Sequence, residues 1–140
     1  MALKTKSIYE PRSPDDGVRI LVTRFYPRGV KKDRFDRWDR RLSPSRELVE
    51  SYKAGRTAWR QFRISFLKEM NSLESSSALE ELRALSRGGD VTLLCYEKEG
   101  EHCHRQLVRE IVVKKKRADA PERRRIRFYS RKKSGRKASK

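Results

Sequence analysis

Residues 91–108 read VTLLCYEKEGEHCHRQLV, and this stretch decides the fold. It opens with an apolar run at 91–96, continues through the polar turn EKEGE at 97–101, and enters a helical pattern carried by Leu107, Val108, Ile111 and Val112. A strand that is apolar throughout, instead of alternating, is typical of a sheet covered on both faces. The stretch therefore predicts a strand, a turn and a helix of a parallel α/β sheet.

A second apolar run, VRILVTRFYP at 18–27, has the same character. It is bounded by Asp15-Asp16-Gly17 and by Pro27, which are turn and breaker signals. We expect it to be a second, largely buried strand.

The residues between these two strands have helical patterning. Ser43-Pro44 predicts the start of a helix over 45–53. Ser77 with Glu80 predicts a capping box for a short helix that ends at Gly88-Gly89. Between these two helices, one helical face is expected to pack on the sheet as a core stripe. Its members are Trp59, Phe62, Phe66, Met70 and Leu73.

The order strand, helices, strand, helix predicts an α/β fold with a single compact domain. We expect a mostly parallel sheet flanked by helices in Rossmann-like layers over residues 1–113, its last helix being about ten residues long. Residues 114–140 are expected to form a basic C-terminal extension, with a possible last strand at 126–129 followed by a flexible arm.

The segment DRFDRWDRR, residues 33–41, repeats an acidic and a basic residue every three positions. On a helical turn this period would align three aspartates on one side and pair the neighbouring charges. We interpret the segment as a salt-bridged lid with Phe35 and Trp38 buried, in preference to a surface that stacks nucleic-acid bases.

The composition favours a cytoplasmic protein with no membrane partner. Of the 140 residues, 40% are charged, and no apolar run approaches the roughly 18 residues that a membrane span needs. The N-terminus lacks the apolar segment of a secretory signal. Two cysteines are too few for a disulfide framework, so free, catalytic or metal-bound thiols are expected.

The net charge of +18 is concentrated at one end of the chain. Residues 114–140 hold fourteen Lys or Arg against Asp119 and Glu122, a net charge of +12. A basic block of this kind is typical of binding to a polyanion, and nucleic acid is the expected partner. The residues expected to neutralise phosphates are Lys114, Lys115, Lys116, Arg117, Arg123, Arg124, Arg125, Arg127, Arg131, Lys132, Lys133, Arg136, Lys137 and Lys140.

Both cysteines and both histidines lie between residues 95 and 104. A thiol in the first turn of a helix is acidified by the helix dipole, so Cys103 is a candidate nucleophile with His104 and Arg105 beside it. The alternative is structural, with Cys95 and His104 as core residues. Zinc, with Cys95, His102, Cys103 and His104 as candidate ligands, is disfavoured, because the spacing is poor and adjacent helical residues diverge too far to share one tetrahedral ion. No metal or cofactor is expected.

Arg109 stands six positions after Cys103, as in protein phosphatases. The intervening residues contain no glycine and begin the helical stripe, so they cannot wrap a phosphate, and we discount this pattern.

Four segments resemble the domain-of-unknown-function family 488 (DUF488), including its YeaO-like branch. They are KSIYEPRSPDDGVRILVTRFYPRGVKK, LSPSRELVESY, TAWRQFRISFLKEM and VTLLCYEKEGEHCHRQLV, in order over residues 6–113. The resemblance implies a compact α/β domain without an established reaction. It implies a pocket formed by Arg24, Arg28, Cys95, Glu97, Cys103, His104 and Arg105. Two features depart from the family: Thr23 stands where an acidic residue is usual, and the basic extension is additional.

Two functions follow as expectations. The first is a nucleic-acid-associated protein that binds RNA, including ribosomal RNA, through its basic extension. The alternative is an enzyme acting on a phosphorylated or nucleotide-like substrate. Cys103 would be the nucleophile, His104 would orient it or exchange protons, Glu97 would lie in the same site, and Arg105 with Arg24 or Arg28 would hold the anion.

Overall fold

The computed structural model describes residues 2–97 and 101–118, and the side chains up to residue 114. Its centre is a parallel sheet in the order β1-β4-β2-β3. The strands are β1 (Leu3–Ser7), β2 (Val18–Leu21), β3 (Arg37–Trp38) and β4 (Val91–Cys95). Every residue of β4 is buried, because β1 and β2 pair with its two edges and the sheet is covered on both faces. The expected α/β fold with a parallel sheet is confirmed.

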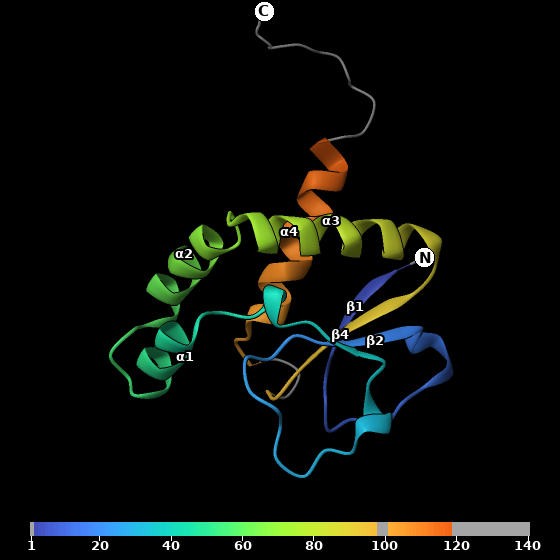
Figure 1. The fold of residues 1–140 in the computed structure, drawn as a ribbon, viewed down its shortest axis with the longest axis horizontal. Coiled ribbons are helices and arrows are strands. Elements are labelled where there is room, and N and C mark those ends of the chain that lie inside the picture. Colours follow the sequence, from blue (N-terminus) through green and yellow to red (C-terminus); the bar gives the residue numbers. More distant parts are fainter. Residues whose placement is uncertain (1, 98–100, 119–140) are drawn as a thin grey trace, which may run out of the picture.

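Four helices of the described residues cover one face of this sheet (Figure 1). They are α1 (Arg46–Lys53), α2 (Trp59–Glu69), α3 (Leu73–Gly88) and α4 (His104–Ala118). All four contribute to one apolar cluster with the strands. Ile20 and Leu93 point into this cluster from the sheet, and Phe66 and Val108 meet them from α2 and α4. The main core therefore lies between the sheet and the helical layer.

The opposite face of the sheet is covered by loops. Leu21 and Leu94 point to this side, where they form a second, smaller cluster with Ile8. Phe35 and Trp38 pack on that cluster and are half-buried. The segment 33–41 thus covers the sheet, as expected of a lid.

The helical geometry expected for this lid is wrong. Residues 32–34 form a 3₁₀ turn, and residues 37–38 form the edge strand β3. Pairing with β2 overrides the local period: the backbone amide of Asp36 donates to the Arg19 carbonyl, and its carboxylate accepts from the Arg19 amide at 2.8 Å. One local ion pair is present, between Asp39 and Arg41, whereas Asp36 pairs with the distant Arg12.

The helix starts differ from the sequence-based expectations in two places. Ser72, and not Ser77, caps α3, because its side chain accepts the amide of Ser75. The core stripe of α2 ends at Met70, and Leu73 is 84% exposed because it opens the next helix. The Gly88-Gly89 terminus of α3 is confirmed.

One further strand was not anticipated, and two expected helices differ in their bounds. Strand β1 escaped notice because LKTKS carries two lysines and is apolar at one end only. Helix α1 begins at Arg46 with Ser45 as its cap, since the Ser45 hydroxyl accepts the amide of Leu48. Helix α4 is fifteen residues long, five more than expected, and runs past residue 113. The strand expected at 126–129 lies outside the described residues.

Asp16 anchors the loop side of the sheet through buried charge. Its carboxylate binds Arg19 at 2.6 Å and Lys6 at 3.0 Å, and the Arg19 side chain is completely buried. Burial opposes the charge of Asp16, but the Ser13 amide and these two cations outweigh it and lower its pKa to about 2. Breaking such a pair would leave an uncompensated buried charge.

No helix among the described residues has the length and apolarity to cross a bilayer.

Gly17 offers a test of the close approach between the β1–β2 loop and the residue before β4. Its φ is +66°, and a Cβ there would overlap the carbonyl group of Asp90. We expect Gly17→Ala to lower the free energy of unfolding by at least about 2 kcal/mol more than Gly29→Ala does. Gly29 also has a positive φ, +75°, but a Cβ there meets nothing within 4 Å. Urea denaturation of both variants makes the measurement, and equal losses would contradict the predicted steric overlap.

Candidate functional site

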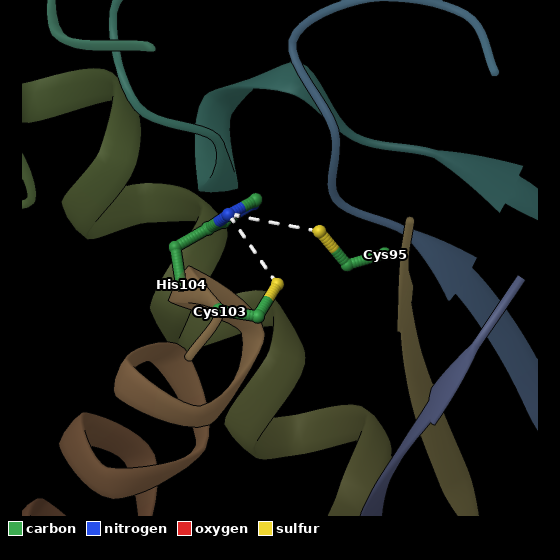
Figure 2. A group of neighbouring side chains, drawn as sticks. All are labelled: Cys95, Cys103 and His104. Atoms are coloured by element: carbon green, nitrogen blue, oxygen red, sulfur yellow. Dashed lines mark hydrogen bonds between the residues drawn. The ribbon is translucent and has the colours of Figure 1, made fainter. Parts of the chain in front are cut away.

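The candidate site lies at the carboxyl edge of the sheet. Cys95 is the last residue of β4, Cys103 directly precedes α4, and His104 is the first residue of that helix. Figure 2 shows the two sulfur atoms converging on the imidazole from the strand and from the helix start. All three side chains are buried, and both cysteines are free thiols. We call these three residues the Cys-Cys-His cluster.

One nitrogen of His104 faces both sulfurs. Its Nδ1 is 3.8 Å from the Sγ of Cys95 and 3.8 Å from the Sγ of Cys103. Its Nε2 donates to the backbone carbonyl of Val22, which keeps the proton on Nε2 and fixes the ring. Nδ1 can therefore accept a thiol proton, or donate to a thiolate once the ring is protonated.

The two thiols differ in acidity. Burial opposes ionisation of Cys103, but hydrogen bonding from Cys95 and the adjacent His104 outweigh it and lower its pKa to about 6. Its place directly before α4 also puts it at the positive end of the helix dipole. Burial raises the pKa of Cys95 well above its usual value, and the neighbouring Cys103 and Glu97 add to this. Cys103 is therefore the thiolate of the pair.

His104 and Glu97 complete the charge pattern. Burial favours the neutral imidazole, but the Cys103 thiolate and the Val22 carbonyl act against it and raise the pKa of His104. Burial likewise disfavours ionised Glu97, yet the hydrogen bond from the Cys95 thiol lowers its pKa. The Cys95 thiol donates to a Glu97 oxygen at 3.1 Å. Glu97 therefore accepts from Cys95, and His104 is the base that faces both thiols.

Arg105 supports the site from the protein interior. Its side chain is completely buried, and its Nη1 donates to the backbone carbonyl of Glu97 at 2.7 Å. It therefore holds the end of the strand that carries Cys95 and does not line the cavity. Arg109, six residues after Cys103, donates to the Leu3 carbonyl at 2.7 Å, which agrees with the rejection of a phosphatase loop.

The Cys-Cys-His cluster opens onto a cavity of about 120 Å³. Its walls are mainly aromatic. They include Phe25, Tyr52, Trp59, Phe62 and Tyr96. His102, which the sequence placed among candidate ligands, instead stacks on Trp59 with ring centroids 4.5 Å apart and an interplanar angle of 11°. A flat apolar ligand fits such walls.

Two cations line the same cavity. The Arg24 guanidinium donates to the carbonyls of Pro44 and Arg40, and the Lys53 ammonium lies 5.3 Å from the centre of the Tyr96 ring. Among the described residues, neither cation forms an ion pair with a carboxylate, so both charges remain available to an anion. Arg28 is exposed and does not line the cavity; its carbonyl accepts the Tyr9 hydroxyl.

Several site residues had no signal in the sequence. Lys53 and Tyr52 end α1, and only the fold brings them opposite Tyr96. Trp59 and Phe62 belong to the expected core stripe, yet both also face the cavity. Of the expected phosphate-binding residues, Lys114 is exposed on α4 and positions 115–117 belong to the same helix; the others lie outside the described residues.

The fold and the site define a small parallel α/β protein with a buried Cys-Cys-His cluster where β4 leads into α4. The chain belongs to the DUF488 family: a family model described as the active DUF488-N3 subclade matches residues 3–116. The resemblance inferred from the sequence is thereby confirmed.

Relatives occur in distant bacteria. The chain is 33% identical to the uncharacterised protein YeaO of Escherichia coli (strain K12) over 96 residues, which is 67% of this chain and 82% of YeaO. It is 37% identical over 92 residues to the uncharacterised proteins Mb3100c of Mycobacterium bovis and Rv3073c of Mycobacterium tuberculosis, covering 64% of this chain and 75% of each relative. No solved structure matches the chain.

The unequal acidity of the two thiols can be measured by alkylation. In the unmodified chain, we expect the rate of the first alkylation by iodoacetamide, at Cys103, to rise through a midpoint near pH 6, because the thiolate is the reacting form. In Cys103→Ser, the remaining Cys95 should stay unreactive at neutral pH. Intact-mass spectrometry across pH 5–9 gives both rates. A Cys103 midpoint near the pKa of free cysteine, about 8.5, would contradict an activated thiol.

Proposed function

We propose that this protein is an enzyme that uses Cys103 as a nucleophile on a phosphorylated or nucleotide-like substrate. The observation that carries this proposal is the contact of Cys103 with Nδ1 of His104 at the floor of an aromatic cavity. A nucleophile next to a base, with the base oriented by a third group, is the general pattern of covalent catalysis. Here the orienting group is the Val22 carbonyl.

Each group has a distinct role in this proposal. The Cys103 thiolate attacks the electrophilic centre of the substrate, and Nδ1 of His104 returns a proton to the leaving group. Neutral His104 then takes a proton from water, the water oxygen attacks the group bound to Cys103, and cleavage of the bond to sulfur releases the product and restores the thiolate and the protonated imidazole. Glu97 keeps the Cys95 thiol oriented, and Arg105 holds the strand end from behind, so both are positioning residues.

The cavity favours a ligand with an aromatic ring and a negative charge. Trp59, which stacks on both Phe62 and His102, and the other aromatic side chains of the wall favour an aromatic ring in the ligand. Arg24 and Lys53 supply positive charge on the same cavity. The matching subclade is described as active, which also favours an enzyme over a scaffold.

Arginine substitution tests the substrate class. Full-length protein is titrated with nucleoside mono-, di- and triphosphates, and binding is followed by Trp59 fluorescence in a Trp38→Phe background. We expect Arg24→Gln to weaken binding by roughly tenfold, since a charge-assisted hydrogen bond contributes about 1.5 kcal/mol. Arg28→Gln, four residues away and outside the cavity, should change it less than about twofold.

Turnover distinguishes an enzyme from a binding protein. Product release from any nucleotide that binds should be lost in Cys103→Ser and kept in part in Cys95→Ser. Full activity in folded Cys103→Ser, or equal losses in the two arginine variants, would contradict the proposal.

We further propose that the basic extension associates the protein with nucleic acid in the cytoplasm, with RNA, including ribosomal RNA, as the preferred partner. The observation that favours this second function is the net charge of +12 over residues 114–140. Lysine and arginine at this density release counterions from a polyphosphate, which supports affinity without sequence readout. The catalytic proposal does not depend on it.

Charge removal in the intact chain tests this association. Six residues near the C-terminus are replaced by Gln: Arg131, Lys132, Lys133, Arg136, Lys137 and Lys140. We expect at least a tenfold loss of RNA affinity at low salt and a shallower dependence on salt, because fewer counterions are released. Fluorescence anisotropy with structured RNA and with duplex DNA measures both. As a control, Arg46, Arg56, Arg60 and Arg87→Gln in the folded domain should have a smaller effect; equal losses would exclude the extension as the binding element.

A further inference from the structure

We propose that Cys95, Cys103 and His104 form a binding site for one thiophilic divalent cation, with Zn²⁺ as the preferred ion. If the proposed enzymatic function holds, the bound ion would also block the Cys103 nucleophile. The binding site itself stands on geometry.

The three ligand atoms already lie at distances that one ion can span. The sulfurs of Cys95 and Cys103 and Nδ1 of His104 lie within 4.8 Å of one another, and each sulfur is 3.8 Å from Nδ1. With Zn–S near 2.3 Å and Zn–N near 2.0 Å, ligand atoms around one tetrahedral ion are separated by roughly 3.5–4 Å. Only small side-chain shifts are needed to bring all three onto one ion.

Cys103 lies outside the helix, contrary to the sequence-based expectation that disfavoured a shared ion. That expectation assumed that Cys103 and His104 are adjacent positions on a helix, which would direct their side chains apart. Helix α4 begins at His104, so Cys103 belongs to the preceding turn and its side chain is free to converge with that of its neighbour (Figure 2). His102 is not a ligand, because it stacks on Trp59.

His104 presents the correct nitrogen for coordination. Its Nε2 donates to the Val22 carbonyl, which leaves the lone pair on Nδ1 directed at the sulfurs. Metal-binding histidines almost always donate their second nitrogen to a carbonyl or carboxylate in this way, which fixes the tautomer and raises the basicity of the ligand. The coordinating tautomer is therefore present before an ion arrives.

Charge balance also favours a divalent ion at this buried place. Two thiolates neutralise a 2+ ion, so the occupied cluster carries no net charge of its own, and the two thiol protons leave to solvent. Sulfur and imidazole ligands select zinc over the harder magnesium and calcium ions. Glu97, whose carboxylate already accepts from Cys95 at 3.1 Å, lies next to the ligands.

An ion can reach the cluster through the cavity. Once bound by three protein ligands, it keeps a fourth coordination position for another ligand. Cys95, Cys103 and His104 all line the cavity, so the ion reaches them from the solvent side. Three protein ligands and one exchangeable position form the usual arrangement of a zinc site that remains accessible to small molecules. In this site the fourth ligand would be water or Glu97.

Cobalt titration is the direct experiment. Full-length protein is stripped with EDTA and titrated with Co²⁺ and then with Zn²⁺ under reducing conditions. We expect one ion per chain and a near-ultraviolet sulfur-to-cobalt charge-transfer band, which Zn²⁺ abolishes by displacement. The chain holds only two cysteines, so such a band reports this cluster.

Three variants and a protection assay give the controls. Cys95→Ser should weaken Zn²⁺ binding at least a hundredfold while Cys103 remains open to alkylation, and His104→Ala should also lose the ion. His102→Ala, the matched control, should bind normally because that ring faces Trp59. In unmodified protein, Zn²⁺ should protect Cys103 from iodoacetamide, which needs no variant to fold.

The outcomes separate this proposal from the catalytic one. Absence of a thiolate band together with unprotected Cys103 in unmodified protein would overturn the metal site, even if EDTA-treated enzyme turns over a nucleotide. Zinc binding by the unmodified protein, together with full activity of the Cys103→Ser variant, would support the metal site and contradict the role of Cys103 as a nucleophile.

Discussion

The geometry of the site depends on two hydrogen bonds made by the backbone of Val22. Its amide donates to the Leu94 carbonyl at 3.0 Å and extends the β2–β4 pairing, while its carbonyl accepts the imidazole of His104. One residue therefore joins the two central strands to the start of α4. Because the imidazole is fixed at this point, the positions of both sulfurs relative to Nδ1 follow from backbone structure.

The turn between β4 and α4 is stabilised from inside the protein. Arg105 was expected to hold a substrate anion, but its guanidinium is completely buried and binds the Glu97 carbonyl. Its position lies outside the residues that line the cavity. The family resemblance identified Arg105 as a residue of the site. Only the fold shows that Arg105 supports the site from the protein interior and does not line the cavity.

Sequence patterns predicted the elements with strong periodicity and missed those defined by pairing. Strands β2 and β4 were evident because continuous apolar runs have few other uses. Strand β1 and the two-residue β3 were not, since each exists only because a neighbouring strand completes its hydrogen bonds. The same holds for the site. The sequence identified the Cys and His residues as candidates, but their convergence could not be predicted because it depends on a helix that starts at His104, one residue later than expected. Lys53 and the aromatic walls come from other elements, which no local pattern connects.

Helix α4 also sets a distance between two regions of the molecule. At about 1.5 Å per residue, position 114 lies roughly 15 Å along the axis from His104. A polymer held at the far end of this rod and a small molecule held at its beginning do not compete for space. If both proposed functions hold, the protein would be a tethered catalyst, and its reaction would be confined to substrates that are present near the polymer that holds it.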